Sequence, residues 1–118
     1  MKILIVDDDE LMLKAISHSL GQEGYAVVLA QDVSSAINIL ENQKIDLIVS
    51  DIMMPNVSGL GLLSMLKEYY FDRIPVILIS SLDKGGIVAN SLGLGATYFL
   101  PKPLDVKELL TCVKSIIK

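Results

Sequence analysis

Short apolar runs alternate along the whole chain with segments whose apolar residues recur at helical spacing, and this alternation constrains the fold more than any other feature. The apolar runs predict strands over residues 2–6, 25–30, 45–50, 75–80 and 98–100. The periodic segments predict helices over residues 11–20, 33–40, 60–67, 87–92 and 105–117. We expect Gly21 and Gly24 to close the first of these helices and Asp32 to cap the second. The fourth helix is the poorest of these, because Gly85, Gly86 and Gly93 surround it.

The first, third and fourth strand segments are almost continuously apolar, as strands are in a parallel sheet that is covered on both faces. Strands that alternate with helices imply right-handed crossovers and a doubly wound α/β fold. With five strands, we expect a flavodoxin-like parallel sheet of strand order 2-1-3-4-5. The 118 residues suit one domain over residues 1–118.

Composition excludes several classes of protein. The net charge is −4 and the lysines are scattered, so we expect no direct binding of nucleic acid. No apolar stretch approaches the roughly 20 residues that span a bilayer, so we expect no membrane segment. Cys112 is the single cysteine, which favours a reducing compartment and a cytoplasmic location.

Polar residues follow the predicted strands at their carboxyl ends, where ligands bind in folds of this kind. Asp7 and Asp8 follow the first strand, Asp51 the third, Ser80 and Ser81 end the fourth, and Lys102 comes after the fifth. The first and third strands are neighbours in the expected order. We therefore expect the three carboxylates to converge.

Three converging carboxylates repel one another and favour a hard divalent cation as a counter-charge. Magnesium (or manganese) suits this site, because it takes oxygen ligands from one or two carboxylates together with phosphate oxygens. Lys102 offers a positive charge and Ser80 a hydroxyl for the same oxygens. These groups point to phosphoryl transfer in which a carboxylate is the nucleophile.

Four segments resemble the receiver domains of response regulators over essentially the whole chain. They are ILIVDDDE at 3–10, DLIVSDIMMPNVSGL at 46–60, PVILISS at 75–81 and GATYFLPKPL at 95–104. The acid pair, the aspartate of the D-x-x-M-P segment, the serine after the fourth strand and the Lys-Pro pair occur in the family's order and at suitable spacing.

The resemblance implies a role for each matching residue. Asp51 would be the phosphoacceptor, and the metal would be held by Asp8, by Asp51, by the backbone carbonyl of Met53 and, through a water molecule, by Asp7. Ser80, Lys102 and Phe99 would bind the phosphoryl group or switch with it. The Lys102–Pro103 bond resembles the family's cis peptide.

The resemblance also implies partners. A histidine kinase or a histidine phosphotransfer protein would donate the phosphoryl group, and a downstream protein of unknown identity would respond. The chain would not be an enzyme in the usual sense, although it would promote its own phosphotransfer and dephosphorylation. A contact surface, with a possible homodimer, is expected on the face of the fourth helix, fifth strand and fifth helix.

Three other functions compete with this interpretation. A haloacid-dehalogenase-like phosphatase requires a second aspartate two residues after its nucleophile, where this chain has Met53. A flavodoxin-like cofactor binder requires a Ser-, Thr- and Gly-rich loop after the first strand, where this chain has four consecutive acids. An interaction module that has the receiver fold but is never phosphorylated stays open.

Met53 and Leu82 would flank the phosphoryl group without a polar atom to orient an attacking water molecule. We therefore predict slow autodephosphorylation, and Met53→Asn should accelerate it. Decay of the phosphorylated chain and of the variant measures this. An unchanged or slower decay in the variant would contradict the hypothesis.

Overall fold

The computed structural model describes residues 1–51, 64, 74–80, 96–101 and 104–116. Five strands form one parallel sheet in the order β2-β1-β3-β4-β5, as the sequence predicts. The strands are β1 (Lys2–Val6), β2 (Ala26–Ala30), β3 (Leu47–Asp51), β4 (Val76–Ser80) and β5 (Tyr98–Pro101). The predicted helices over 60–67 and 87–92 fall outside the described residues, apart from the single residue 64.

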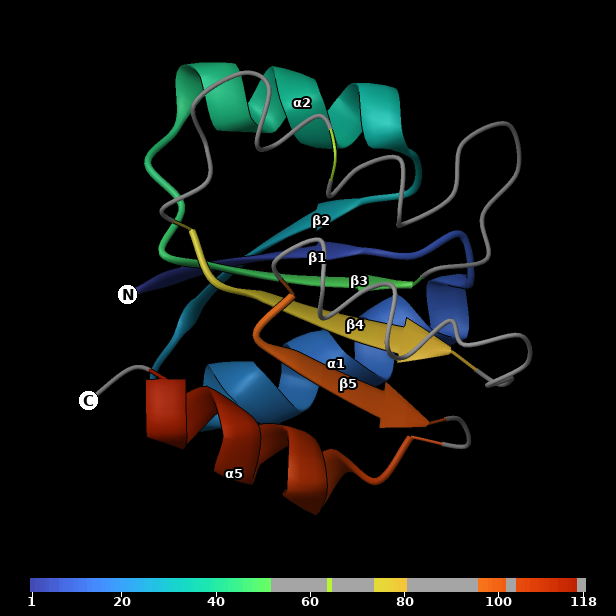
Figure 1. Ribbon diagram of the computed structural model, residues 1–118, viewed down its shortest axis with the longest axis vertical. Helices are drawn as coiled ribbons and strands as arrows, with labels where there is room; N and C mark the ends of the chain where they lie inside the picture. Colours follow the sequence, from blue (N-terminus) through green and yellow to red (C-terminus); the bar gives the residue numbers. More distant parts are fainter. Residues whose placement is uncertain (52–63, 65–73, 81–95, 102–103, 117–118) are drawn as a thin grey trace.

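Three helices cover the sheet among these residues: α1 (Glu10–Gln22), α2 (Val33–Asn42) and α5 (Val106–Ile116). Figure 1 shows α2 on one face of the sheet and α1 with α5 on the other. The carboxyl ends of the strands share one edge, and the beginning of β1 and the end of α5 lie toward the opposite edge. The doubly wound arrangement is therefore present around the described part of the sheet.

Each face of the sheet has its own apolar core, because side chains of a strand alternate between faces. Leu4, Val6 and Ile48 pack on the α2 side, whereas Ile3 and Ile5 pack on the side of α1 and α5. Almost every residue of β1 and all of β3 are buried, which explains their continuously apolar sequence.

The described helices differ from their predicted ranges by one or two residues at several ends. Gly21 and Gly24 were expected to close the first helix, but α1 continues through Gly21 to Gln22. The chain reverses at Gly24, whose φ of +89° suits glycine because it has no Cβ. The predicted cap of the second helix is confirmed, since the Ser35 N–H donates to Asp32 Oδ1 at 2.7 Å.

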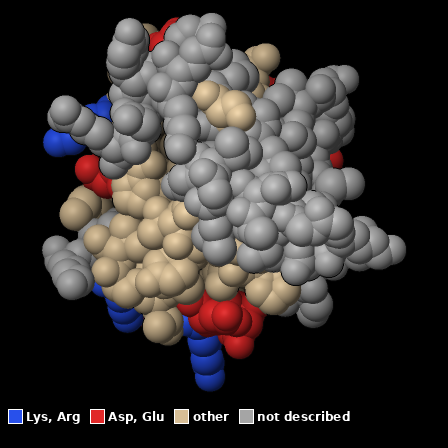
Figure 2. All heavy atoms as spheres, viewed as in Figure 1, with Lys and Arg blue, Asp and Glu red and all other residues tan. Residues whose placement is uncertain are grey.

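Basic side chains are scattered on the part of the surface that Figure 2 shows. On the face in Figure 2 the coloured lysine atoms lie apart and form no continuous basic area. Of the helices described, none has both the length and the apolar character that crossing a bilayer requires. The predictions about nucleic acid and location stay predictions.

Leu11 and Leu20 both belong to α1 but differ in how much of the side chain is exposed. Leu20 is 0% exposed in the core shared with α5, whereas Leu11 is 77% exposed. We predict that Leu20→Ala lowers the free energy of unfolding by about 2–5 kcal/mol. Leu11→Ala should change it by about 0.5 kcal/mol or less. Urea unfolding of both variants measures the difference. Equal losses of unfolding free energy would contradict the assignment of Leu20 to the buried face of α1 and of Leu11 to its exposed face.

The cap of α2 should make stability depend on pH. The backbone N–H of Ser35, and then its side chain, hydrogen-bond to Asp32 and hold the pKa of that carboxyl below its usual 3.8. A carboxyl whose folded pKa is lowered stabilises the fold above its unfolded pKa, and that stabilisation is lost as the pH falls through the folded value. Asp32→Ala should therefore lower Tm at neutral pH, and its deficit should shrink in acid.

Melting followed by circular dichroism at about pH 7 and about pH 2.5 tests this dependence. Asp32→Asn is the matched control, because asparagine caps a helix well but does not titrate in this range. A deficit of Asp32→Ala that stays the same at both pH values would contradict the prediction.

Candidate functional site

Asp7 continues the line of β1 one residue beyond its end. Its backbone N–H donates to the carbonyl oxygen of Ala30 at 3.0 Å, which extends the ladder between β1 and β2. The residue is only 1% exposed. Its side chain is therefore held at the carboxyl edge of the sheet by the backbone of two strands.

Asp51 is the last residue of β3, within the strand rather than after it as the sequence suggested. Val6 pairs with Ser50 in the parallel ladder of β1 and β3, so Asp7 and Asp51 occupy the next position of the same register. Alternation places both on the side of the sheet that faces α1. Asp51 is 3% exposed.

Asp8 completes the group from the surface side, since its side chain is exposed. One carboxylate oxygen from each of Asp7, Asp8 and Asp51 lies within 4.8 Å of the others. The structure thus brings together the three carboxylates that the sequence predicted to converge. They lie where the strand order reverses: the chain runs from β1 to β2 on one side of β1, and then from β2 to β3 on the other side of β1.

Asp9 has a structural function that the sequence analysis did not identify. Its side chain caps α1 by accepting hydrogen bonds from the N–H groups of Leu11, at 3.0 Å, and Met12, at 3.3 Å. Its own N–H donates to Asp7 Oδ1 at 2.9 Å. An aspartate directly before a helix is a capping signal, but it was obscured here by three neighbouring acids.

Ser50 is the second residue that sequence reasoning missed. It is fully buried beside Asp51, and its hydroxyl donates to the carbonyl oxygen of Asp51 at 3.1 Å. This bond satisfies a hydroxyl that would be costly to bury alone. The available signal in the sequence was that Ser50 is the only residue between the apolar segment 47–49 and Asp51.

The other predicted residues are described only in part. Ser80 is the last residue of β4, where it pairs with Pro101 of β5. Phe99 is half-buried and packs against the core on the α2 side. Met53, Lys102 and Pro103 lie outside the described residues, so their predicted roles stay predictions.

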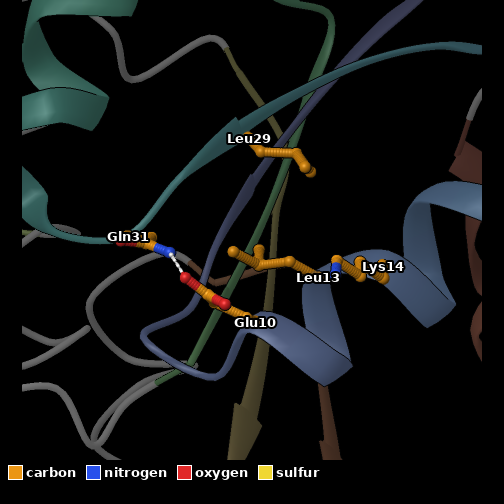
Figure 3. Close-up of a pocket in the computed structure, with 5 residues that line it drawn as sticks. All are labelled: Glu10, Leu13, Lys14, Leu29 and Gln31. Carbon is orange, nitrogen blue, oxygen red and sulfur yellow. Dashed lines mark hydrogen bonds between the residues drawn. The ribbon is translucent and has the colours of Figure 1, made fainter.

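A shallow pocket lies next to this site rather than within it. It has a volume of about 240 Å³ and is lined by Glu10, Leu13, Lys14, Leu29 and Gln31. Figure 3 shows these side chains between α1 and the end of β2, with Gln31 donating to Glu10 at 3.2 Å. None of the three clustered carboxylates lines this pocket.

The donor set of the cluster fits a hard divalent cation. All three groups offer anionic oxygen, which magnesium and manganese prefer to nitrogen or sulfur. Two of them are buried, where the repulsion between like charges is poorly screened by water. The exposed Asp8 leaves one side of the group toward solvent, as a cation that keeps several water ligands requires.

The family model of the response regulator receiver domain matches residues 3–114. The chain belongs to this family. The two segments at 3–10 and 46–60 that resemble the family contain β1 and β3. The acidic cluster of this receiver domain lies at the ends of these two strands.

Curated relatives agree with this assignment. The receiver domain is 33% identical over 118 residues to the response regulator MprA of Mycobacterium sp. (strain KMS), covering 100% of this chain and 51% of that protein. It is 35% identical over 117 residues to the nisin biosynthesis regulatory protein NisR of Lactococcus lactis subsp. lactis, covering 99% and 50%. The chain thus spans about half the length of these relatives.

Solved structures of response regulators have a similar fold. A two-component response regulator from Clostridium difficile superposes with a TM-score of 0.92 at 26% identity, covering 99% of this chain and 95% of that one. The chemotaxis response regulator CheY4 of Vibrio cholerae gives a TM-score of 0.89 at 26% identity, with 98% and 97% covered. The chain is a receiver domain of a two-component response regulator.

Proposed function

We propose that this receiver domain accepts a phosphoryl group on Asp51 from a phosphohistidine donor, with Mg²⁺ (or Mn²⁺) bound beside it. The observation that carries the proposal is the cluster of Asp7, Asp8 and Asp51 at the junction of β1 and β3. The cluster lies at the carboxyl edge of a doubly wound sheet, and folds of this kind bind phosphorylated ligands at that edge.

Asp8 and Asp51 would hold the metal directly, and Asp7 would do so through a water molecule. The Met53 carbonyl is proposed as a further ligand from the sequence resemblance alone. When bound, the cation draws negative charge from the phosphoryl oxygens and so lets a second anion approach the carboxylates. Exposed Asp8 would give the metal and the donor a common route to buried Asp51.

The chemistry requires little from the protein beyond position and charge. A carboxylate oxygen of Asp51 attacks the phosphorus, the nitrogen–phosphorus bond of the donor breaks, and the imidazole leaves with a proton from solvent. No general base is needed, because the nucleophile is already an anion. Lys102 is proposed to stabilise the transferred oxygens, and Ser80 and Phe99 to respond to them.

We further propose that the output is a protein contact and not the turnover of a substrate. A histidine kinase or a histidine phosphotransfer protein would supply the phosphoryl group, and a downstream protein would read the result. The proposed contact surface includes β5 and α5, where Tyr98 is 40% exposed and its hydroxyl oxygen accepts a bond from Ser115 at 3.3 Å. A homodimer through this surface belongs to the same proposal.

Phosphorylation by a small donor tests the function directly. The chain is incubated with acetyl phosphate and Mg²⁺, and its intact mass is recorded. We expect one added phosphoryl group, which is lost in Asp51→Asn and when the metal is chelated. Asp46→Asn is the matched control: Asp46 lies at the opposite edge of the sheet, where it accepts a hydrogen bond from the Lys2 N–H at 2.8 Å.

Each outcome has a distinct meaning. Addition that persists in Asp51→Asn would move the acceptor to another residue. No addition from acetyl phosphate or from a phosphohistidine donor would favour an interaction module that works without phosphorylation. Loss of addition in Asp46→Asn would show that general damage to the fold, and not the acceptor carboxyl, controls the reaction.

A further inference from the structure

We infer that Asp9 is a positioning residue that holds Asp7 and Asp8 in the arrangement a divalent cation requires. The inference rests on the proposed function of the cluster. It adds a residue to which neither the sequence motifs nor the family assignment gives a role. Asp9 would not touch the metal; it would act through the turn between β1 and α1.

Two consecutive side-chain-to-backbone bonds define this turn. Asp7 Oδ1 accepts from the N–H of Asp9, and Asp9 Oδ1 accepts from the N–H of Leu11. Each bond joins a carboxylate to the amide two residues later, which is the local geometry that aspartate favours in turns. Asp8 lies between the two bonded residues, so its backbone is fixed from both sides.

The conformation of Asp9 itself depends on its cap. Its φ of −91° and ψ of 108° are extended values, and α1 begins at the next residue. The cap bonds to Leu11 and Met12 are available only while Asp9 stays out of the helix. If the helix extended backward to include residue 9, the amide that holds Asp7 would turn away from it.

The first turn of α1 is also attached to the neighbouring strand. Gln31, directly after β2, donates to Glu10, the first helical residue, as Figure 3 shows. The Asp7 N–H donates to Ala30 at the end of β2. The ends of the turn are therefore anchored to the sheet, and the Asp9 side chain sets the path between them.

The other capping aspartates provide an internal comparison. Asp32 caps α2 and Asp105 caps α5 with the same kind of bond. The residues two positions before them are Ala30 and Pro103, neither of which has a carboxylate to hold. Among the three caps, only Asp9 links a helix start to the acidic cluster.

A rigid turn matters for magnesium more than for most ligands. Magnesium demands near-ideal octahedral geometry, and outer residues that orient its ligands affect its affinity strongly. Asp7 and Asp8 are adjacent in sequence, so a small rotation of their backbone moves both carboxylates together. Fixing this backbone in advance reduces the ordering that binding would otherwise have to impose.

The test compares metal affinity with stability in four proteins. Mg²⁺ binding is followed by amide NMR shifts in a MgCl₂ titration at constant ionic strength, and Tm is measured without metal. Asp9→Ala removes the cap and favours the helix, so we expect Mg²⁺ affinity to fall by about tenfold. Asp9→Asn keeps the cap and removes the charge, and we expect affinity within about twofold of the unsubstituted chain.

Asp32→Ala is the matched control for loss of a helix cap. It should lower Tm much as Asp9→Ala does, yet leave Mg²⁺ affinity within about twofold, because the Asp32 side chain bonds to Ser35 within its own helix. Equal affinity losses in Asp9→Ala and Asp9→Asn would overturn the inference in favour of charge alone. An unchanged affinity in Asp9→Ala would overturn it outright, and an equal loss in Asp32→Ala would replace it with general destabilisation.

Failure of the proposed function gives a different result. If the unsubstituted chain shows no saturable Mg²⁺ binding, the metal proposal fails and the role of Asp9 toward the metal fails with it. If the unsubstituted chain binds Mg²⁺ and all variants bind equally, only the inference about Asp9 fails.

Discussion

The parallel pairing of β1 with β3 is the constraint on which the rest of the site depends. With Val6 opposite Ser50, the next pair in the register is Asp7 and Asp51. A slip of one residue would turn every side chain of one strand to the opposite face, separating the carboxylates and exposing apolar residues. The cores on the two faces therefore enforce the alignment of the acids, although no acid contributes to either core.

Most of the described architecture could be predicted from the sequence because each face of each element carries a strong signal. Continuous apolar runs identified the buried strands, and Leu13, Ile16 and Leu20 identified the inner face of α1. The end of that helix was predicted two residues too early, because Gly21 was treated as a stop together with Gly24. Gly21 has open space around it and tolerates the helix, and the reversal occurs at Gly24.

The convergence of the acids was also predictable, because it follows from strand order alone. The hydrogen bonds that fix them were not. Which of four consecutive acids caps α1 depends on where the helix begins to within one residue, and boundaries are the least determined part of a sequence pattern. The bond from Ser50 to the Asp51 carbonyl is equally local, since a serine at a strand end has many possible partners.

The central position of β1 and β3 has a kinetic consequence for the acidic cluster. Strands buried on both faces and paired on both sides open only when the whole domain opens, whereas segments with fewer buried contacts open more often. Amide protons of these two strands should therefore be among the slowest to exchange with deuterium. Asp7 and Asp51 are attached to the part of the molecule that unfolds last, so their spacing would persist through the partial openings of the surrounding helices.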